Sequence, residues 1–204
     1  AGLIGRALDL PVGFDTDVNG AALAESRWGA GQGKPACVYI TIGTGIGGGA
    51  IVDGKPLQGL SHPEMGHIRV PRHPLDTAFP GICPFHGDCL EGLAAGPAIE
   101  QRWGQSLSKL GSPPDKVELI AAYIAQLATS LVLLHMPDRL VFGGGVMKTP
   151  GLIEALRRAT EARLAGYVKA PQLDPGLEGY IVTPGLGDEA GITGAIALGQ
   201  GLLA

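Results

Sequence analysis

The sequence predicts an α/β fold built on a mixed sheet with helices on its faces. Residues 36–42 form an apolar, β-branched run, strand character resumes at 49–52, and Asp53-Gly54 then marks a tight turn before 55–57. Helical and strand patterns alternate over the rest of the chain: helix 117–136, strand 139–142, helix 152–164, strand 180–183 and helix 188–203. Three antiparallel strands followed by helix–strand units are typical of a mixed sheet.

The remaining elements precede these or interrupt them. We expect a helix over 2–10 that ends before Pro11, a short strand at 11–14, a helix over 18–29 and another over 97–105. Asp15, Thr16 and Asp17 stand at the start of the second helix, where an acidic or hydroxyl side chain also serves as an N-cap. Segment 61–97 has no clean periodicity.

Composition narrows the class of protein. A chain of 204 residues with 45% hydrophobic residues can bury a sizeable core, which excludes disorder despite 34 glycines and 16 prolines. A formal net charge of −4 argues against a nucleic-acid partner, because such proteins carry a clustered basic face. Charged residues make up only 17%, so we expect part of the surface to meet another subunit or a further lobe.

Cysteine usage and hydropathy point to the cytoplasm. Three cysteines cannot form an even disulfide framework, and no signal peptide opens the chain. Residues 117–136 could just span a bilayer by length, but Gln126, Thr129 and Ser130 interrupt their apolar stripe. We therefore expect a buried helix there and no membrane association.

Two glycine-rich motifs are candidates for phosphate binding. Residues 41–49 and 142–146 each follow an apolar strand, and glycines let backbone N–H groups approach an anion. The first is neither a Walker loop nor a Rossmann fingerprint. Each motif alone is also compatible with a turn that binds nothing, but two of them in one lobe favour a nucleotide.

Four side chains in the irregular segment have the spacing of a zinc site: His67, Cys83, His86 and Cys89. Two thiolates and two imidazoles suit tetrahedral zinc, and four protein ligands leave no open position, so the metal would be structural. Unrelated polar residues or reactive thiols remain alternatives, and His62 and His73 compete with His67. Cys37 lies in an apolar strand and is expected in the core.

Three carboxylates could serve a reaction. Asp17 lies near a strand-to-helix junction, and Glu64 and Glu91 flank the zinc segment. A sugar hydroxyl that attacks a phosphate needs a positioned base, and carboxylates also hold neighbouring hydroxyls. Spacing alone equally fits caps and solvated surface groups.

Together these residues resemble the ROK family of sugar kinases, repressors and related enzymes. Segment 15–25 is similar to the family pattern N-D-x-N-x-A-A-L-x-E, with Thr16 where Asn is common. Residues 42–49, 59, 64–67 and 187–195 match further family motifs. Segments 61–67 and 83–97 resemble the bacterial fructokinase subgroup, because His86 takes the place of one thiolate of the commoner C-x-C-G-x-x-G-C motif.

The resemblance implies a ribonuclease H-like lobe of the sugar kinase, Hsp70 and actin superfamily. Residues 1–35 would be the end of an N-terminal lobe carrying the catalytic aspartate, and 36–204 the C-terminal lobe with its zinc loop 61–97. The family's N-terminal glycine-rich hairpin is absent from the sequence. We therefore expect these residues alone to be a weak kinase or inactive, since phosphoryl transfer depends on positioning.

The resemblance also implies individual roles. Asp17 would be the general base, and ATP would act with Mg²⁺. The sugar would meet Thr16, Glu64, His67 and Glu91. The nucleotide would meet Thr44, Gly45, Gly144 and Gly145. Structural Zn²⁺ would be held by His67, Cys83, His86 and Cys89.

The expected activity is ATP-dependent phosphorylation of D-fructose to fructose 6-phosphate by a cytoplasmic homodimer. A glucose or mannose kinase of the same family is the first alternative. A ROK-type repressor that senses sugar through this lobe is the second, although a pure sensor has no need of Asp17 as a base. A zinc-stabilised binding lobe without activity is the third.

Overall fold

The computed structural model describes residues 2–202, and within them a five-stranded mixed sheet has the order β3-β2-β1-β4-β5. The central strand β1 pairs antiparallel with β2 and parallel with β4. β3 then extends the antiparallel side and β5 the parallel side. The strands are β1 (Ala36–Ile42), β2 (Ile46–Val52), β3 (Lys55–Pro56), β4 (Arg139–Gly143) and β5 (Ile181–Val182). The predicted mixed α/β fold is confirmed.

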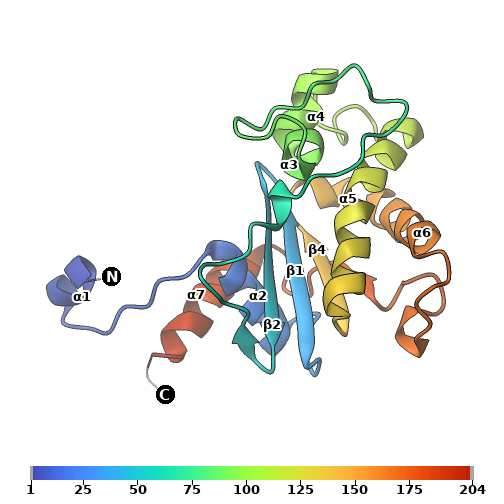
Figure 1. The fold of residues 1–204 in the computed structure, drawn as a ribbon. Coiled ribbons are helices and arrows are strands. Elements are labelled where there is room, and N and C mark those ends of the chain that lie inside the picture. Colours follow the sequence, from blue (N-terminus) through green and yellow to red (C-terminus); the bar gives the residue numbers. More distant parts are fainter. Residues whose placement is uncertain (1, 203–204) are drawn as a thin grey trace.

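Helices cover both faces of this sheet (Figure 1). α5 (Pro114–His135) and α6 (Leu152–Leu164) lie on one face, and α2 (Asp17–Trp28) and α7 (Ala190–Gln200) lie on the other. Side chains alternate along β1: Val38 and Ile40 join the core beneath α5, while Cys37 and Tyr39 join the core beneath α2 and α7. This alternation is the period-two pattern of a strand buried on both faces. Cys37 is fully buried, as expected.

The long helix α5 is part of the core. It is long and apolar enough to cross a membrane, yet 61% of its most apolar window is buried in the protein. It packs against α6, and its Gln126 side chain donates to the Pro71 carbonyl at 3.0 Å. The expectation of a buried helix is confirmed.

A layer of short elements lies above one end of the sheet (Figure 1). It contains η1 (Met65–His67), α3 (Leu90–Ala94) and α4 (Gly96–Trp103), joined by irregular chain. Shorter 3-10 turns complete the fold: η2 (Val146–Lys148), η3 (Pro171–Leu173) and η4 (Gly187–Glu189).

The N-terminal segment departs from the prediction. α1 (Gly2–Leu8) stands apart from the rest, and residues 11–14 are extended chain outside the sheet, so the predicted strand is wrong. Pro11 has no N–H to donate to a ladder, and Phe14 is 92% exposed, so neither pairing nor burial could stabilise a strand. α3 was not predicted, because its five residues are too few to show a helical period.

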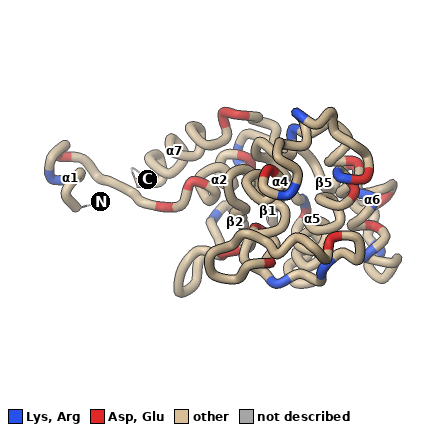
Figure 2. Tube along the Cα trace, turned by 90° about the horizontal axis from the view of Figure 1, so that it is seen from above, with Lys and Arg blue, Asp and Glu red and all other residues tan. Residues whose placement is uncertain are grey.

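Charged residues of both signs are interspersed over the molecule (Figure 2). Exposed apolar side chains lie on α1 and α7, among them Leu3, Ile4, Ile192 and Ile196. This is the apolar surface that the low charge content predicts.

Candidate functional site

Both glycine motifs meet at one end of the sheet. β1 and β4 run parallel with Thr41 opposite Gly143, so their carboxyl ends lie side by side. The turn between β1 and β2 and the turn after β4 both begin there. Ligands of open α/β sheets bind outside the carboxyl ends of parallel strands.

Four predicted site residues surround one hollow of about 340 Å³ at this end. They are Asp17, Thr44, Gly45 and Glu91. The carboxylate predicted as a base and the turn predicted to bind phosphate thus line the same cavity, although they come from different elements. Glu91 lies at the start of α3, and its Oε2 accepts a hydrogen bond from the Ile46 N–H at 2.8 Å.

A second hollow of about 360 Å³ adjoins the first and shares Gly43 and Thr44 with it. Gly145, for which the resemblance implies a nucleotide contact, also lines this hollow. Its other walls include Val146, which belongs to the second glycine-rich motif, and further residues that were not predicted as site residues: Gly96, Pro97, Ile99, Glu100, Ser106, Leu107, Ser108 and Thr149. Their types resemble those of core and turn residues, so no sequence signal singled them out.

The two glycines after β4 differ in their surroundings. Gly144 has φ +91°, and a Cβ there would lie 2.4 Å from the Ile42 carbonyl oxygen. Gly145 has open space where its Cβ would be. Gly144 is therefore required by the close approach of β1, whereas Gly145 keeps the hollow open.

Asp17 and Thr16 begin α2. Thr16 is its N-cap and accepts a hydrogen bond from the Asn19 N–H at 3.2 Å. Asp17 is exposed, and its Oδ1 accepts from the Val18 N–H at 2.8 Å. A carboxylate at a helix N-terminus interacts favourably with the helix dipole, and this one also lines the hollow.

Glu64 lies away from the two hollows. Its carboxylate is 63% exposed and pairs with the His62 ring at 3.2 Å. His62 and Thr16 line a third hollow of about 270 Å³. Thr16 and His62, the partner of Glu64, therefore line a common hollow, and Glu64 itself lines none of the three hollows.

The four predicted metal ligands converge. The ligand atoms of His67, Cys83, His86 and Cys89 all lie within 4.8 Å of one another. His67 Nδ1 is 3.7 Å from Cys83 Sγ and 3.6 Å from Cys89 Sγ, and His86 Nδ1 is 3.6 Å from Cys83 Sγ. Tetrahedral zinc with ordinary Zn–S and Zn–N bonds separates S and N by roughly 3.6 Å. The donor set and spacing therefore fit zinc.

The environment of the two thiols differs. Burial opposes ionisation of Cys83, but backbone N–H groups of His86 and Phe85 outweigh it and lower the pKa of Cys83 to about 6. Burial raises the pKa of Cys89, and the neighbouring Cys83 sulfur adds to this. All three cysteines, including Cys37, are free thiols.

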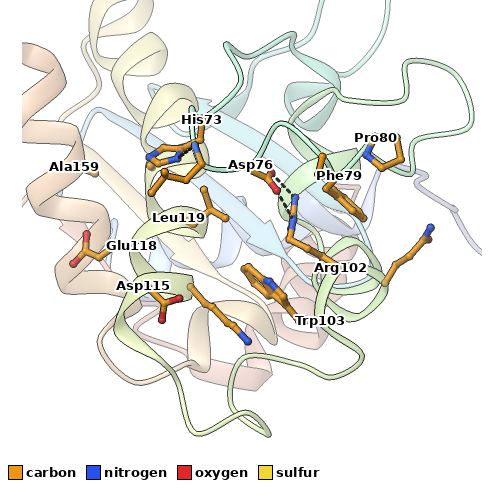
Figure 3. Close-up of a pocket in the computed structure, with 15 residues that line it drawn as sticks. His73, Asp76, Phe79, Pro80, Arg102, Trp103, Asp115, Glu118, Leu119 and Ala159 are labelled. Atoms are coloured by element: carbon orange, nitrogen blue, oxygen red, sulfur yellow. Dashed lines mark hydrogen bonds and ion pairs between the residues drawn. The ribbon is translucent and has the colours of Figure 1, made fainter.

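A larger cavity of about 750 Å³ lies elsewhere and is lined by none of the predicted site residues (Figure 3). Its wall includes a buried ion pair in which Arg102 Nε and Nη2 each donate to the Asp76 carboxylate at 3.1 Å. The Arg102 guanidinium lies over the Phe79 ring at 4.0 Å and near the Trp103 ring at 5.1 Å. Asp76 and Arg102 therefore pair with each other in the wall of this cavity.

Comparison with known proteins assigns the family. The ROK family model matches residues 1–201. The fructokinase of Zymomonas mobilis is 50% identical over 195 residues, which are 95% of this chain and 64% of that protein. The chain thus spans slightly less than two thirds of that relative's length.

Solved structures of ROK family proteins have a similar fold. The ROK hexokinase from Thermus thermophilus has a TM-score of 0.78 at 33% identity, covering 97% of this chain and 67% of its own. A ROK family glucokinase from Streptomyces griseus, in complex with glucose and AMPPNP, has a TM-score of 0.69 at 26% identity, covering 94% and 69%. The chain is a member of the ROK family.

Proposed function

We propose that the protein transfers the γ-phosphoryl group of ATP to the 6-hydroxyl of D-fructose, giving fructose 6-phosphate and ADP. One observation carries the proposal: two adjoining hollows share Gly43 and Thr44, and one of them contains Asp17. Such a pair can hold a nucleotide and an acceptor hydroxyl on either side of one phosphate-binding turn. The similarity to a fructokinase at 50% identity supports fructose as the acceptor.

Phosphoryl transfer needs a general base, hydrogen-bond donors to the phosphate oxygens and an in-line arrangement of the reacting atoms. The sugar oxygen forms a bond to the γ-phosphorus while the bond from that phosphorus to the ADP oxygen breaks. The Asp17 carboxylate takes the hydroxyl proton. The Thr44 hydroxyl and the backbone N–H of Gly45 bind phosphate oxygens, and Mg²⁺ enters with ATP and offsets phosphate charge.

The remaining roles combine position in the structure with the resemblance to the family. The second hollow has the apolar walls Ile99 and Leu107, which suit a flat base, with Gly145 leaving room for it. Gly144 allows the turn after β4 to lie directly against the backbone of Ile42. Thr16, Glu64, His67 and Glu91 would bind sugar hydroxyls.

Zinc in this proposal is structural. His67, Cys83, His86 and Cys89 would hold it, and their four donor atoms fill a tetrahedral shell. When bound, it would fix the irregular segment, and with it the His67 ring, beside the sugar.

A second hexose is the main alternative. The glucokinase from Streptomyces griseus, solved with glucose and AMPPNP, shares the fold at 26% identity, which favours glucose as a competing substrate.

The exposed apolar side chains on α7 support a homodimer or a contact with a neighbouring lobe. We further propose that the protein is cytoplasmic.

The test is ADP release by the full-length gene product with ATP, Mg²⁺ and each of fructose, glucose and mannose. We expect turnover that prefers fructose; preference for glucose or mannose would replace the substrate but keep the mechanism. No turnover with any sugar, from folded metal-loaded protein, would reject the kinase.

Asp17→Asn isolates the base. We expect turnover to fall by about 100-fold or more, because a general base contributes roughly that much. Fold and metal content should stay unchanged, since within residues 2–202 the Asp17 side chain hydrogen-bonds only to the neighbouring Val18 N–H. Near-normal turnover would remove Asp17 as the base.

A further inference from the structure

The turn between β1 and β2 is fastened at both ends by the chain that follows metal ligand Cys89. At one end, the Gly96 N–H donates to the Gly43 carbonyl at 2.8 Å. At the other end, the Ile46 N–H donates to Glu91 Oε2, also at 2.8 Å. Both anchors therefore lie within seven positions of Cys89 along the chain.

Glycines allow this close fit. A Cβ at Gly45 would lie 2.7 Å from Glu91 Oε2, and a Cβ at Gly66 would lie 2.0 Å from the Ile46 carbonyl oxygen. Gly66 directly precedes the metal ligand His67. The turn is thus enclosed from two sides by segments that carry metal ligands.

Glu91 is the side chain that faces both sites. While Oε2 accepts from Ile46, Oε1 lies 3.8 Å from His67 Nε2. His67 directs its other nitrogen, Nδ1, at Cys83 and Cys89. At 3.8 Å the two groups are close but not hydrogen-bonded. A carboxylate that accepts a hydrogen bond from the outer nitrogen of a metal-binding histidine fixes the tautomer and the orientation of the ring, and Glu91 is placed to make that bond when zinc holds His67.

We propose that Glu91 is a positioning residue that couples the metal site to the phosphate-binding turn, so that nucleotide affinity depends on bound zinc. The inference rests on the proposed function, since it assumes that the turn binds a nucleotide and that the four ligands bind zinc. It adds a link between them that neither role requires.

The coupling has a simple physical basis. Zinc fixes the His67 ring and the position of Cys89, which is the N-cap residue of α3. Glu91 and Gly96 then hold the turn in one conformation before the nucleotide arrives. Without zinc, binding must also pay the entropy of ordering the turn. Because coupling between two sites is reciprocal, bound nucleotide should raise the zinc affinity by the same factor.

The experiment measures two affinities on the full-length protein: zinc by competition with a chromophoric chelator, and ADP by calorimetry. ADP is titrated without sugar, so that loss of the predicted sugar contact of Glu91 does not contribute. The proteins are wild type, Glu91→Gln, Glu91→Ala and a control, Glu118→Gln. Glu118 lies on α5 and pairs with Arg158 on the surface, so the control makes the same chemical change away from both sites.

The two Glu91 variants should differ in which affinity they lose. Glutamine has one acceptor oxygen, so it can keep only one of the two contacts and should lower either the zinc affinity or the ADP affinity. If zinc affinity falls, we expect a fall of about 10–100-fold. Alanine keeps neither contact, and we expect both affinities to fall, ADP by about tenfold at saturating zinc. Glu118→Gln should match wild type.

Three results would overturn the coupling: unchanged zinc affinity in Glu91→Ala, unchanged ADP affinity in Glu91→Ala at saturating zinc, or equal ADP affinity of wild type with and without zinc. The last comparison is made if circular dichroism shows that metal-free protein keeps its fold; otherwise the saturating-zinc comparison decides. Wild type that binds zinc but no ADP would reject the nucleotide site as well, which distinguishes failure of the proposed function from failure of the coupling.

Discussion

The sheet and the segment 61–97 are stabilised by different physical effects. Around β1 and β4, side chains such as Ile40 and Phe142 are fully buried among aliphatic neighbours, and the backbone ladder satisfies the polar groups. The segment 61–97 is mostly irregular, and its buried groups include thiols and an ion pair. Regular structure follows from apolar periodicity, whereas the irregular segment depends on a few specific polar contacts and on the zinc site that we propose.

A polar network attaches this segment to the helices. Asp76 accepts from the Tyr123 hydroxyl at 2.8 Å as well as from Arg102, and burial raises the pKa of Tyr123, so the hydroxyl stays protonated as the donor. Arg72 donates to the carbonyls of Asp76 and Phe79. The network spans residues far apart in sequence, so its loss should affect the segment more than the sheet.

Removing the metal should have the largest effect. For Cys89→Ala we expect loss of zinc and a fall in the free energy of unfolding of about 4 kcal/mol or more, since loss of a metal belongs to the severe class of changes. Hydrogen exchange should rise mainly in 61–97. Metal analysis and urea denaturation check this.

Cys37→Ala is the matched control for that variant. Its sulfur is buried in the sheet, so we expect retained zinc and a cost of only about 1 kcal/mol. If wild-type protein purified without chelator contains no zinc, or if Cys89→Ala keeps it, the ligand assignment is wrong.

Breaking the buried ion pair should come next. Asp76→Ala leaves Arg102, whose side chain is 6% exposed, without its partner. Removing one partner of a buried pair costs about 3–5 kcal/mol, and we expect urea denaturation to give a value in that range with zinc retained. A cost below about 1 kcal/mol would mean that the pair is open to water.

A change in the sheet should have the smallest effect. Ile40→Val removes one buried methylene and should cost about 1 kcal/mol. Because Ile40 lies in the apolar core beneath α5, we expect zinc and ADP affinities to stay at wild-type values. Weaker zinc binding in this variant would show that the two regions are not separately stabilised.

The sequence was sufficient where periodicity decides structure. The predicted strand 36–42 and helix 152–164 agree with β1 and α6 to the residue, since β-branched alternation and helical spacing are local signals. The extended stretch at 11–14 was misread because its apolar residues have no sheet neighbour, and no local signal reports that.

Sequence motifs predicted which residues belong to the candidate site, but not which of them contact one another. The convergence of His67, Cys83, His86 and Cys89 was predicted from the spacing of cysteines and histidines, because a metal site restricts residue type. The hydrogen bond from Ile46 to Glu91 joins positions 45 apart, and the Asp76–Arg102 pair joins positions 26 apart. Each partner alone resembles a surface charge, so tertiary structure was needed to connect them.

The two outer strands affect how the protein behaves at high concentration. Within residues 2–202 the sheet ends in β3 and β5, each only two residues long. Strands this short offer few free N–H and C=O groups of their own to a strand of another molecule, which limits edge-to-edge pairing at β3 and β5. Self-association of folded molecules should therefore proceed through helix surfaces, and β-rich fibres should form only after the sheet itself has opened.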